Sequence, residues 1–291
     1  MSTILQNNSR EELSLLTAGV DVGSSSVKIA ILKMPGDGSV RPLSLRTDRI
    51  RRRDLRKIIH EGFDAALDEA GVKKNDIAYV ASTGEGELVD FRRGHFYGMT
   101  THARGAQFLL PDTRAVLDIG ALHARAIVIN DRSRVLEYRM TSQCASGSGQ
   151  FLENVARYLG IALEEVGPLS CSASNPQLVS SICAVLAETD VINMVSRGIS
   201  TADILKGIHL SMAGRYIKLL RSIGALGHVT ITGGLAADTG LTLALQEKVA
   251  EDGLALKVQT HPQSIYAGAL GAALWGGFRH SVLARRAEAV A

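Results

Sequence analysis

One pattern occurs twice in this chain of 291 residues: a strand that ends in Asp-x-Gly, a short turn and a second strand. The first copy runs from Leu16 to Leu32 (LTAGVDVGSSSVKIAIL) and the second from Val116 to Asn130 (VLDIGALHARAIVIN). The aspartates at the two strand tips, Asp21 and Asp118, are 118 − 21 = 97 residues apart. A single hairpin of this kind is common. Two equivalent copies at about a domain's spacing predict an internal duplication, and therefore two α/β domains.

The turns of both hairpins have the chemistry of a phosphate site. Backbone N–H groups and hydroxyls at a tight turn can bind phosphate oxygens, and a carboxylate at a strand tip can hold a hydrated Mg²⁺. A third segment, the strand Val229–Thr232 followed by two glycines and a helix, would let a nucleoside lie against backbone. The alternative for each segment alone is an ordinary turn or helix start. The predicted ATP site consists of catalytic Asp21 and Asp118, of Gly23, Ser24, Ser25, Ser26, Lys28 and Gly120 at the phosphates, and of Gly233, Gly234, Glu188 and Lys206 at the nucleoside.

Composition and missing motifs exclude several classes of protein. The sequence has no G-x-x-x-x-G-K-[ST] motif, which excludes a P-loop NTPase. A net charge of +3 and 4% aromatic residues do not suggest a nucleic-acid partner. The N-terminus does not resemble a signal peptide, and no apolar run is long enough to span a bilayer. We therefore expect a cytoplasmic protein, whose three cysteines would not form a disulfide framework.

The spacing of apolar residues divides the chain into three parts. Residues 1–16 are predicted to be a polar extension, residues 17–112 with 263–280 a first domain, and residues 113–262 a second domain. A cluster of six basic residues opens the first predicted helix and is interpreted either as a solvated helix face or as a docking surface. We predict helices at 49–70, 100–110, 150–159, 184–196, 202–223 and 264–278, further strands at 77–82, 135–140 and 256–259, and a loop at 167–176.

Two cysteines stand next to predicted helix starts. Cys144 lies among small residues just before the helix expected from Gln150, and Cys183 follows 183 − 144 = 39 residues later. A cysteine facing a helix N-terminus favours the thiolate and hence a metal or redox role. The alternative for a single buried cysteine is a small apolar filler. Three cysteines in one chain cannot by themselves form a four-thiolate site.

The segments QCASGSGQFLE and SSICAVLAETDVI resemble the paired cysteine motifs of one ATPase family. Its members are the activators of 2-hydroxyacyl-CoA dehydratases and the ATP-binding subunits of benzoyl-CoA reductase, together the BadF/BadG/BcrA/BcrD ATPase family. The resemblance extends from Ala18 to Gly277. It implies two duplicated ribonuclease-H-like domains, as in the actin, sugar-kinase and heat-shock-chaperone ATPase superfamily. It also implies a [4Fe–4S] cluster that Cys144 and Cys183 share with a homologous subunit, and it leaves Cys171 with a structural or incidental role.

Within that family, the chain is most similar to D-type subunits of the reductases. This similarity implies an ATP-hydrolysing electron-activation subunit that takes low-potential electrons from ferredoxin and passes them to catalytic subunits for reductive dearomatisation of benzoyl-CoA. Dehydratase activators carry Gly-Gly-Gln-Asp where this chain has Gly120–His123, with the sequence GALH. The glutamine that would orient the attacking water is therefore missing, and His123 is either its substitute or a solvated turn residue.

Three other functions remain open from the sequence. The first is a homodimeric activator of a 2-hydroxyacyl-CoA dehydratase, which would couple ATP hydrolysis to electron transfer in the same way but deliver the electron to a dehydratase. The second is a small-molecule kinase, which would need a catalytic carboxylate aligned with a substrate hydroxyl and would not require Cys144 and Cys183. The third is a non-catalytic ATP-binding regulator, which the missing glutamine favours.

Overall fold

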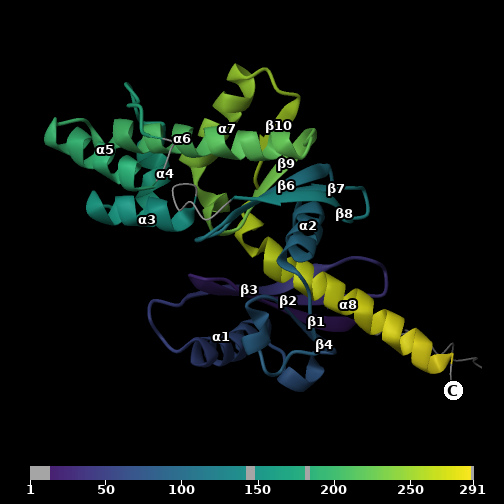
Figure 1. Cartoon of the computed structure of the whole chain (residues 1–291). Coiled ribbons are helices and arrows are strands. Elements are labelled where there is room, and N and C mark those ends of the chain that lie inside the picture. The colour runs from purple at the N-terminus through teal and green to yellow at the C-terminus, as the bar shows by residue number, and fades with distance from the viewer. Residues whose placement is uncertain (1–13, 142–147, 181–183, 290–291) are drawn as a thin grey trace, which may run out of the picture.

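Two five-stranded sheets, one above the other, form the two halves of the molecule (Figure 1). The computed structural model describes residues 14–141, 148–180 and 184–289. The first sheet has the strand order β3-β2-β1-β4-β5 and the second the order β10-β9-β6-β7-β8. The strands of the first sheet are β1 (Leu15–Val22), β2 (Ser26–Met34), β3 (Arg41–Arg49), β4 (Tyr79–Gly84) and β5 (Gly94–His95). Those of the second are β6 (Thr113–Ile119), β7 (Ala124–Ile129), β8 (Val135–Met140), β9 (Gly227–Thr232) and β10 (Leu256–Gln259).

The two sheets have the same topology, which explains the repeated sequence pattern. In the first, the central strand β1 pairs antiparallel with β2 and parallel with β4. In the second, the central strand β6 pairs antiparallel with β7 and parallel with β9. Each central strand ends at the aspartate of its Asp-x-Gly pattern. The predicted α/β class with duplicated halves is confirmed, whereas the division of the chain into domains at residue 112 stays a prediction.

The outer face of the first sheet is covered by α1 (Leu55–Ala70). This helix buries Ile58, Ile59 and Phe63 against the sheet, and Asp54 caps it by accepting a hydrogen bond from the N–H of Lys57. The prediction that the helix begins at residue 49 is wrong. The backbone takes positive φ angles of 41° and 63° at residues 51 and 52, which no α-helix tolerates, so residues 50–54 form a loop and only Arg56 and Lys57 of the basic cluster lie in the helix.

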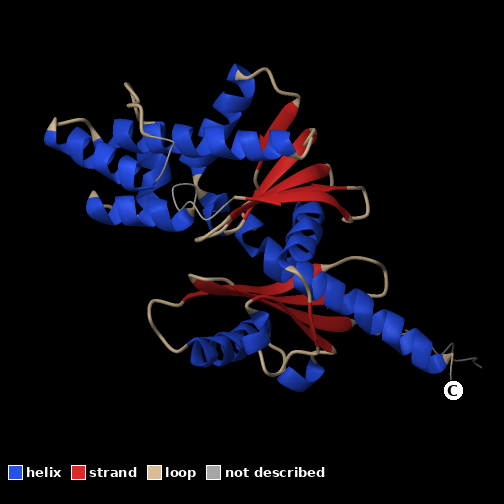
Figure 2. Cartoon of the chain, in the orientation of Figure 1, coloured by secondary structure: helices blue, strands red, loops and turns tan. Residues whose placement is uncertain are grey.

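Five helices lie on the far side of the second sheet (Figure 2). The prediction of a loop over residues 167–176 is wrong, because a helix extends to Cys171 despite Pro168. Its Val166 and Ser170 are buried against neighbouring helices, so tertiary packing outweighs the local preference of glycine and proline for a loop. The five helices are α3 (Gly149–Tyr158), α4 (Leu163–Cys171), α5 (Ala184–Ser196), α6 (Thr201–Ser222) and α7 (Thr239–Glu251).

Two further helices, α2 (Gly98–Leu109) and α8 (Ala267–Glu288), fill the space between the sheets (Figure 1). Helix α2 packs against β6 of the second sheet, and α8 packs against β1, β2 and β4 of the first. The two helices approach closely, since a Cβ atom added at Gly105 would lie 1.9 Å from the carbonyl oxygen of Ala267. The sheets are therefore joined through a narrow helix–helix contact. Short 3₁₀ helices are found at Lys74–Asp76, Gly86–Leu88, Gly234–Ala237 and Ser264–Tyr266.

Helix α8 continues ten residues beyond its predicted end at residue 278, as 288 − 278 = 10. Its last turns project away from the first sheet (Figure 1). Among the described residues, no helix combines the length and apolar character needed to cross a membrane.

Candidate functional site

A cavity of about 660 Å³ lies between the two hairpins and is lined from both halves of the molecule. The first half contributes the turn between β1 and β2 and the loop that follows β3. The second half contributes the turn after β6, the first turns of α3 and α4, and the segment between β9 and α7. Any molecule bound in this cavity would touch both sheets at once. It is therefore the candidate site.

The first hairpin presents hydroxyls and an amine to this cavity. Its turn is closed by a hydrogen bond of 3.0 Å from the N–H of Gly23 to the carbonyl oxygen of Ser26. Three consecutive serines and Lys28 line the cavity, as predicted from their position in the turn. Asp21 is buried at the end of β1, directly opposite Lys28 in the antiparallel ladder. The lining serines are Ser24, Ser25 and Ser26.

The second hairpin has a different chemistry at the equivalent positions. Asp118 is buried at the end of β6 and faces Arg125 across the ladder. The Nη2 and Nε atoms of Arg125 lie 2.6 and 2.9 Å from Asp118 Oδ2, so the guanidinium contacts the carboxylate twice. Gly120 lines the cavity, and its N–H donates to the carbonyl oxygen of His123. The side chain of His123 is exposed, beside the equally exposed Leu122.

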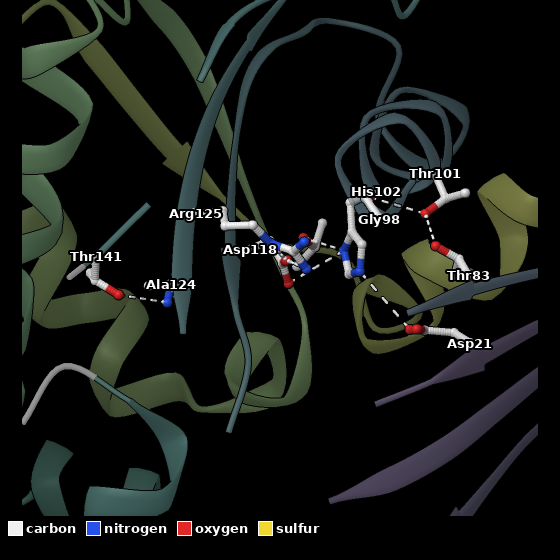
Figure 3. Close-up of polar contacts among 10 residues, drawn as sticks. Asp21, Thr83, Gly98, Thr101, His102, Asp118, Ala124, Arg125 and Thr141 are labelled. Atoms are coloured by element: carbon white, nitrogen blue, oxygen red, sulfur yellow. Dashed lines mark hydrogen bonds and ion pairs between the residues drawn. The ribbon is translucent and has the colours of Figure 1, made fainter. Parts of the chain in front are cut away.

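His102 of α2 stands between the two aspartates (Figure 3). Its Nδ1 atom lies 3.0 Å from Thr232 Oγ1 and 3.4 Å from Asp118 Oδ1, and its Nε2 atom lies 3.9 Å from Asp21 Oδ2. Burial lowers the pKa of His102, although the carboxylates of Asp118 and Asp21 oppose this effect. The ring is therefore neutral at about pH 7, and one ring nitrogen carries the proton.

The ionisation of Asp118 depends on its neighbours. Burial favours the protonated acid, but the charge and hydrogen bonds of the Arg125 guanidinium, with His102 adjacent, outweigh burial and hold the pKa of Asp118 below its usual range. Asp118 is therefore an ionised hydrogen-bond acceptor in a buried position.

The glycines after β9 approach the second hairpin closely. Gly233 has a φ of 83°, and a Cβ atom at this position would lie 2.5 Å from Asp118 Oδ1. Only glycine fits this conformation and this space. Gly234 lines the cavity, as does Asp238, which caps α7 by accepting a hydrogen bond from the N–H of Leu241. The predicted strand–Gly-Gly–helix segment thus reaches the same cavity as the two hairpins.

The loop after β3 brings positive charge to the rim of the cavity. Arg49, Arg51 and Arg52 line it, together with Arg157 of α3. Arg49 also forms an ion pair with Glu164 of α4, which links the two halves across the cavity. Arg49, Arg51 and Arg52 thus do not form a helix face, whereas Arg56 and Lys57 of the same cluster lie on α1, and the docking interpretation stays a prediction. A cavity rim of this charge suits an anionic ligand.

Six predicted site residues do not line the cavity: Asp21, Gly23, Asp118, Gly233, Glu188 and Lys206. The first four lie directly behind its lining, in the two hairpins and the glycine pair. Glu188 is exposed on α5, and Lys206 of α6 forms an ion pair of 2.6 Å with Glu247. The structure therefore does not bring these last two residues to the site.

The predicted cluster ligands Cys144 and Cys183 lie outside the described residues. Helices α3 and α5, which follow these two segments in the chain, contact one another. The third cysteine, Cys171, is exposed at the end of α4, with its Sγ atom 3.9 Å from Thr239 Oγ1. Within the described ranges, no group of three or more His, Cys, Asp and Glu side chains could hold a metal ion.

The residues at the cavity fit a magnesium–nucleotide complex by their chemistry. Carboxylate oxygens, hydroxyls, turn N–H groups and an amine are the groups that bind Mg²⁺ and phosphate. No sequence pattern indicated three residues that the structure places at the site. His102 is one of several polar residues in a predicted helix, Thr232 belongs to a buried strand, and Asp238 resembles an ordinary helix cap. The basic residue at the start of β7 was visible in the repeat, but its contact with Asp118 was not.

Comparison with known proteins places the chain among ATPases. The sequence profile of the BadF/BadG/BcrA/BcrD ATPase family matches residues 18–276. The chain is 61% identical to the D-type subunit of benzoyl-CoA reductase from Thauera aromatica over 271 residues, which are 93% of this chain and 96% of that protein.

Two solved structures are also similar. The (R)-2-hydroxyglutaryl-CoA dehydratase component A of Acidaminococcus fermentans superposes with a TM-score of 0.85 at 31% identity, over 92% of this chain and 100% of that one. The activator of 2-hydroxyisocaproyl-CoA dehydratase from Clostridium difficile, solved with bound ADPNP, has the same TM-score at 28% identity, over 94% of this chain and 98% of that one.

Proposed function

The chain belongs to the BadF/BadG/BcrA/BcrD ATPase family, and we propose that it is the ATP-hydrolysing electron-activation subunit of a benzoyl-CoA reductase. Its fold is that of the actin, sugar-kinase and heat-shock-chaperone ATPase superfamily. The observation that carries the proposal is the 61% identity to the D-type benzoyl-CoA reductase subunit over almost the whole of both chains. Dehydratase activators share the fold at about half that identity.

In this proposal ATP occupies the cavity between the hairpins. Ser24, Ser25, Ser26 and Lys28 would bind the phosphates beside the turns that Gly23 and Gly120 close, and Gly233 and Gly234 would flank the nucleoside. Asp21 and Asp118, at the strand ends behind these turns, would hold the hydrated Mg²⁺, which supplies charge neutralisation at the phosphates when it is bound. The serines, Lys28, Gly120 and Gly234 line the cavity and support these roles, and the rim arginines add positive charge. We leave Glu188 and Lys206 out of the set because they lie on helices away from the two hairpins.

Hydrolysis would act on the angle between the two sheets. Phosphates bound in the cavity are held from both sides, so cleavage and release of one phosphate removes contacts that join the two halves. Apart from that cavity, the halves meet mainly where α2 and α8 pack together. Small residues at that contact, such as Gly105 and Gly271, allow the helix backbones to touch. A change at the phosphates can therefore become a rotation of one half against the other.

The redox centre of the proposal is a [4Fe–4S] cluster held by Cys144 and Cys183 together with two cysteines of a homologous subunit. When bound, such a cluster supplies a one-electron redox centre whose potential depends on hydrogen bonding and solvent exposure at the sulfurs. The exposed apolar side chains of α5, the helix that follows Cys183, support a subunit contact at this place. These side chains are Val185, Leu186, Ile192 and Val195.

The remaining partners follow from the proposed reaction. Ferredoxin would donate the electron, and catalytic subunits that bind benzoyl-CoA would receive it. A cytoplasmic location is part of the same proposal. The alternative client, a 2-hydroxyacyl-CoA dehydratase, is supported by identities of 31–35% to three dehydratase activators.

The test is a reconstitution under anaerobic conditions. The chain is purified with the subunits encoded beside it and assayed with reduced ferredoxin and Mg-ATP, once with benzoyl-CoA and once with a 2-hydroxyacyl-CoA. The proposal predicts ATP-dependent loss of the benzoyl-CoA ring absorbance, with stoichiometric ATP hydrolysis. Dehydration of the 2-hydroxyacyl-CoA with no reduction of benzoyl-CoA would instead establish the activator function.

A further inference from the structure

We propose that His102 is a positioning residue of the ATPase site, whose ring is held by Thr232 and sets the spacing between the Asp118 and Asp21 carboxylates. The inference rests on the proposed function, because it concerns the carboxylates assigned there to Mg-ATP. It adds a residue from α2 to a site that was otherwise built from two hairpins and a glycine pair. The observations that carry it are the contacts of the ring, the packing around it and the place of α2 between the sheets.

The contacts of the ring determine which nitrogen carries the proton. Nδ1 faces two oxygens, Thr232 Oγ1 at 3.0 Å and Asp118 Oδ1 at 3.4 Å. The Thr232 hydroxyl can accept as well as donate a hydrogen bond, and carboxylate oxygens accept them. A proton on Nδ1 therefore suits both neighbours, with Thr232 Oγ1 as the hydrogen-bond acceptor and Asp118 Oδ1 next to it. In this tautomer a polar ring edge lies beside Asp118 Oδ1 while Arg125 binds Oδ2.

Asp118 has close neighbours at both of its oxygens. Arg125 lies on the neighbouring strand β7 and binds Oδ2 from within the second sheet. The His102 ring approaches Oδ1 to 3.4 Å from α2, outside the sheet. Neighbours on two sides limit the rotation of the carboxylate about its last side-chain bond. It is therefore preorganised for a ligand whose geometry is fixed.

On the other side of the ring stands the first sheet. Nε2 lies 3.9 Å from Asp21 Oδ2, which is contact without a hydrogen bond. The ring therefore separates the two carboxylates as a neutral spacer. The space is closely filled: a Cβ atom at Gly268 of α8 would lie 2.4 Å from Asp21 Oδ2 and 2.9 Å from His102 Nε2. Any change in the ring's position must displace Asp21, Asp118 or α8.

The neighbouring residue on α2 makes the corresponding contact with the first sheet. Thr101 Oγ1 lies 3.1 Å from Thr83 Oγ1 of β4, and this pair is buried (Figure 3). Two successive residues of one helix thus contact strand tips in both sheets. Helix α2 is therefore placed to transmit a change in the angle between the sheets to the spacing of the two aspartates.

Simple space filling is the competing explanation, and it makes the opposite prediction for two substitutions. A buried histidine that only fills space would be replaced well by His102→Phe, which keeps a ring, and badly by His102→Asn, which leaves a cavity. A positioning histidine is replaced better by asparagine, whose Nδ2–H₂ group donates from nearly the same place as Nδ1–H. Phenylalanine keeps the bulk but loses the donor. The order of the two variants therefore separates the two explanations.

The experiment uses the full chain assembled with its partner subunits. ADP affinity is measured by calorimetry with and without Mg²⁺, and kcat and KM for ATP are measured on the same preparations. We expect His102→Phe to lose most of the Mg²⁺-dependent gain in ADP affinity and about 10- to 100-fold in kcat, because an apolar ring would lie beside Asp118 Oδ1 and leave Thr232 without its hydrogen-bond partner. His102→Asn keeps both within about threefold, although it melts at a lower temperature than His102→Phe.

The control is His228→Asn. His228 also pairs with a carboxylate, at 3.2 Å from Asp112, but on the surface and away from the cavity. Its variant is expected to match the wild-type chain in every readout. Wild-type kcat and Mg²⁺ dependence in His102→Phe, or a greater loss in His102→Asn than in His102→Phe, would overturn the inference. A wild-type complex without ATPase activity would contradict the proposed function instead, and the Mg²⁺ dependence of ADP binding would still decide the role of His102.

Discussion

The two Asp-x-Gly hairpins share one topology and differ in their charge balance. In the first, Lys28 lines the cavity, and none of the ion pairs found in the described residues involves it. In the second, the equivalent Arg125 is paired with Asp118. The turns differ in the same sense, because the first has three serines where the second has Ala121, Leu122 and His123. The two hairpins share their strand arrangement, while only the first presents hydroxyls and an amine to the cavity.

This difference gives the second hairpin another task. Its carboxylate is bound by Arg125 at Oδ2 and lies beside His102 at Oδ1, and its turn carries no hydroxyl. The exposed His123 at its tip has no described contact with the cavity, which argues against its substitution for the glutamine of the dehydratase activators. We infer that the first hairpin binds phosphate and the second provides a fixed carboxylate.

The largest expected effect is that of Asp21→Ala. Removal of this carboxylate takes away one of the two proposed ligands of hydrated Mg²⁺. Among the described ion pairs, the contact of Asp21 is a distant one, with His102 Nε2 at 3.9 Å, so little besides the proposed Mg²⁺ depends on this side chain. We expect ATPase activity of the assembled complex to fall by about 10²-fold or more, with an unchanged circular dichroism spectrum. Turnover like that of the wild-type complex would show that the first hairpin is not the catalytic one.

A matched pair of substitutions tests the charge difference directly. Lys28→Met removes a charge that faces the cavity, so we expect ATP affinity to fall by about tenfold or more with little change in melting temperature. Arg125→Met leaves the buried Asp118 carboxylate without its positive partner, so we expect a loss of about 1–3 kcal/mol in the free energy of unfolding. Calorimetric titration with ATP and urea unfolding measure the two effects. An exchange of the two phenotypes would break the comparison.

A smaller effect is expected in the pH dependence of stability. The pKa of Asp118 is lowered in the folded chain, so its ionised form stabilises the fold above the usual aspartate range of about pH 4. That contribution is lost as the pH falls through the lowered pKa. The difference in unfolding free energy between the wild-type chain and Asp118→Asn should therefore be largest near neutral pH and narrow below about pH 5. A difference that stays constant or widens on acidification would contradict the charge pairing of Asp118.

The sequence was sufficient to predict the hairpins and the glycine pair, because their signals are local. A turn between alternating strands, or two glycines between a strand and a helix, is determined by residues within a few positions. The same holds for β8 and α5, whose ends agree with the prediction at Val135–Met140 and Ala184–Ser196.

Contacts between distant segments could not be predicted in this way. His102 reaches Thr232, which is 232 − 102 = 130 residues away, and no local pattern encodes that approach. The predicted helix included Arg51 and Arg52, because no feature of the local sequence indicates the positive φ angles that these residues adopt. The opposite error occurs at Pro168, where a loop was predicted and a helix is found. Packing of that helix outweighs the usual effect of proline.

The most direct test of the redox account is the iron content of three cysteine variants in the reconstituted complex. We expect Cys144→Ser and Cys183→Ser each to lose the cluster iron, the EPR signal of the reduced cluster and ATP-dependent electron transfer, while ADP binding persists. Cys171→Ser should keep all of these, because Cys171 lies exposed at the end of α4. Full iron and a full EPR signal in the Cys144 or Cys183 variant would contradict the account and leave a kinase or a non-redox regulator.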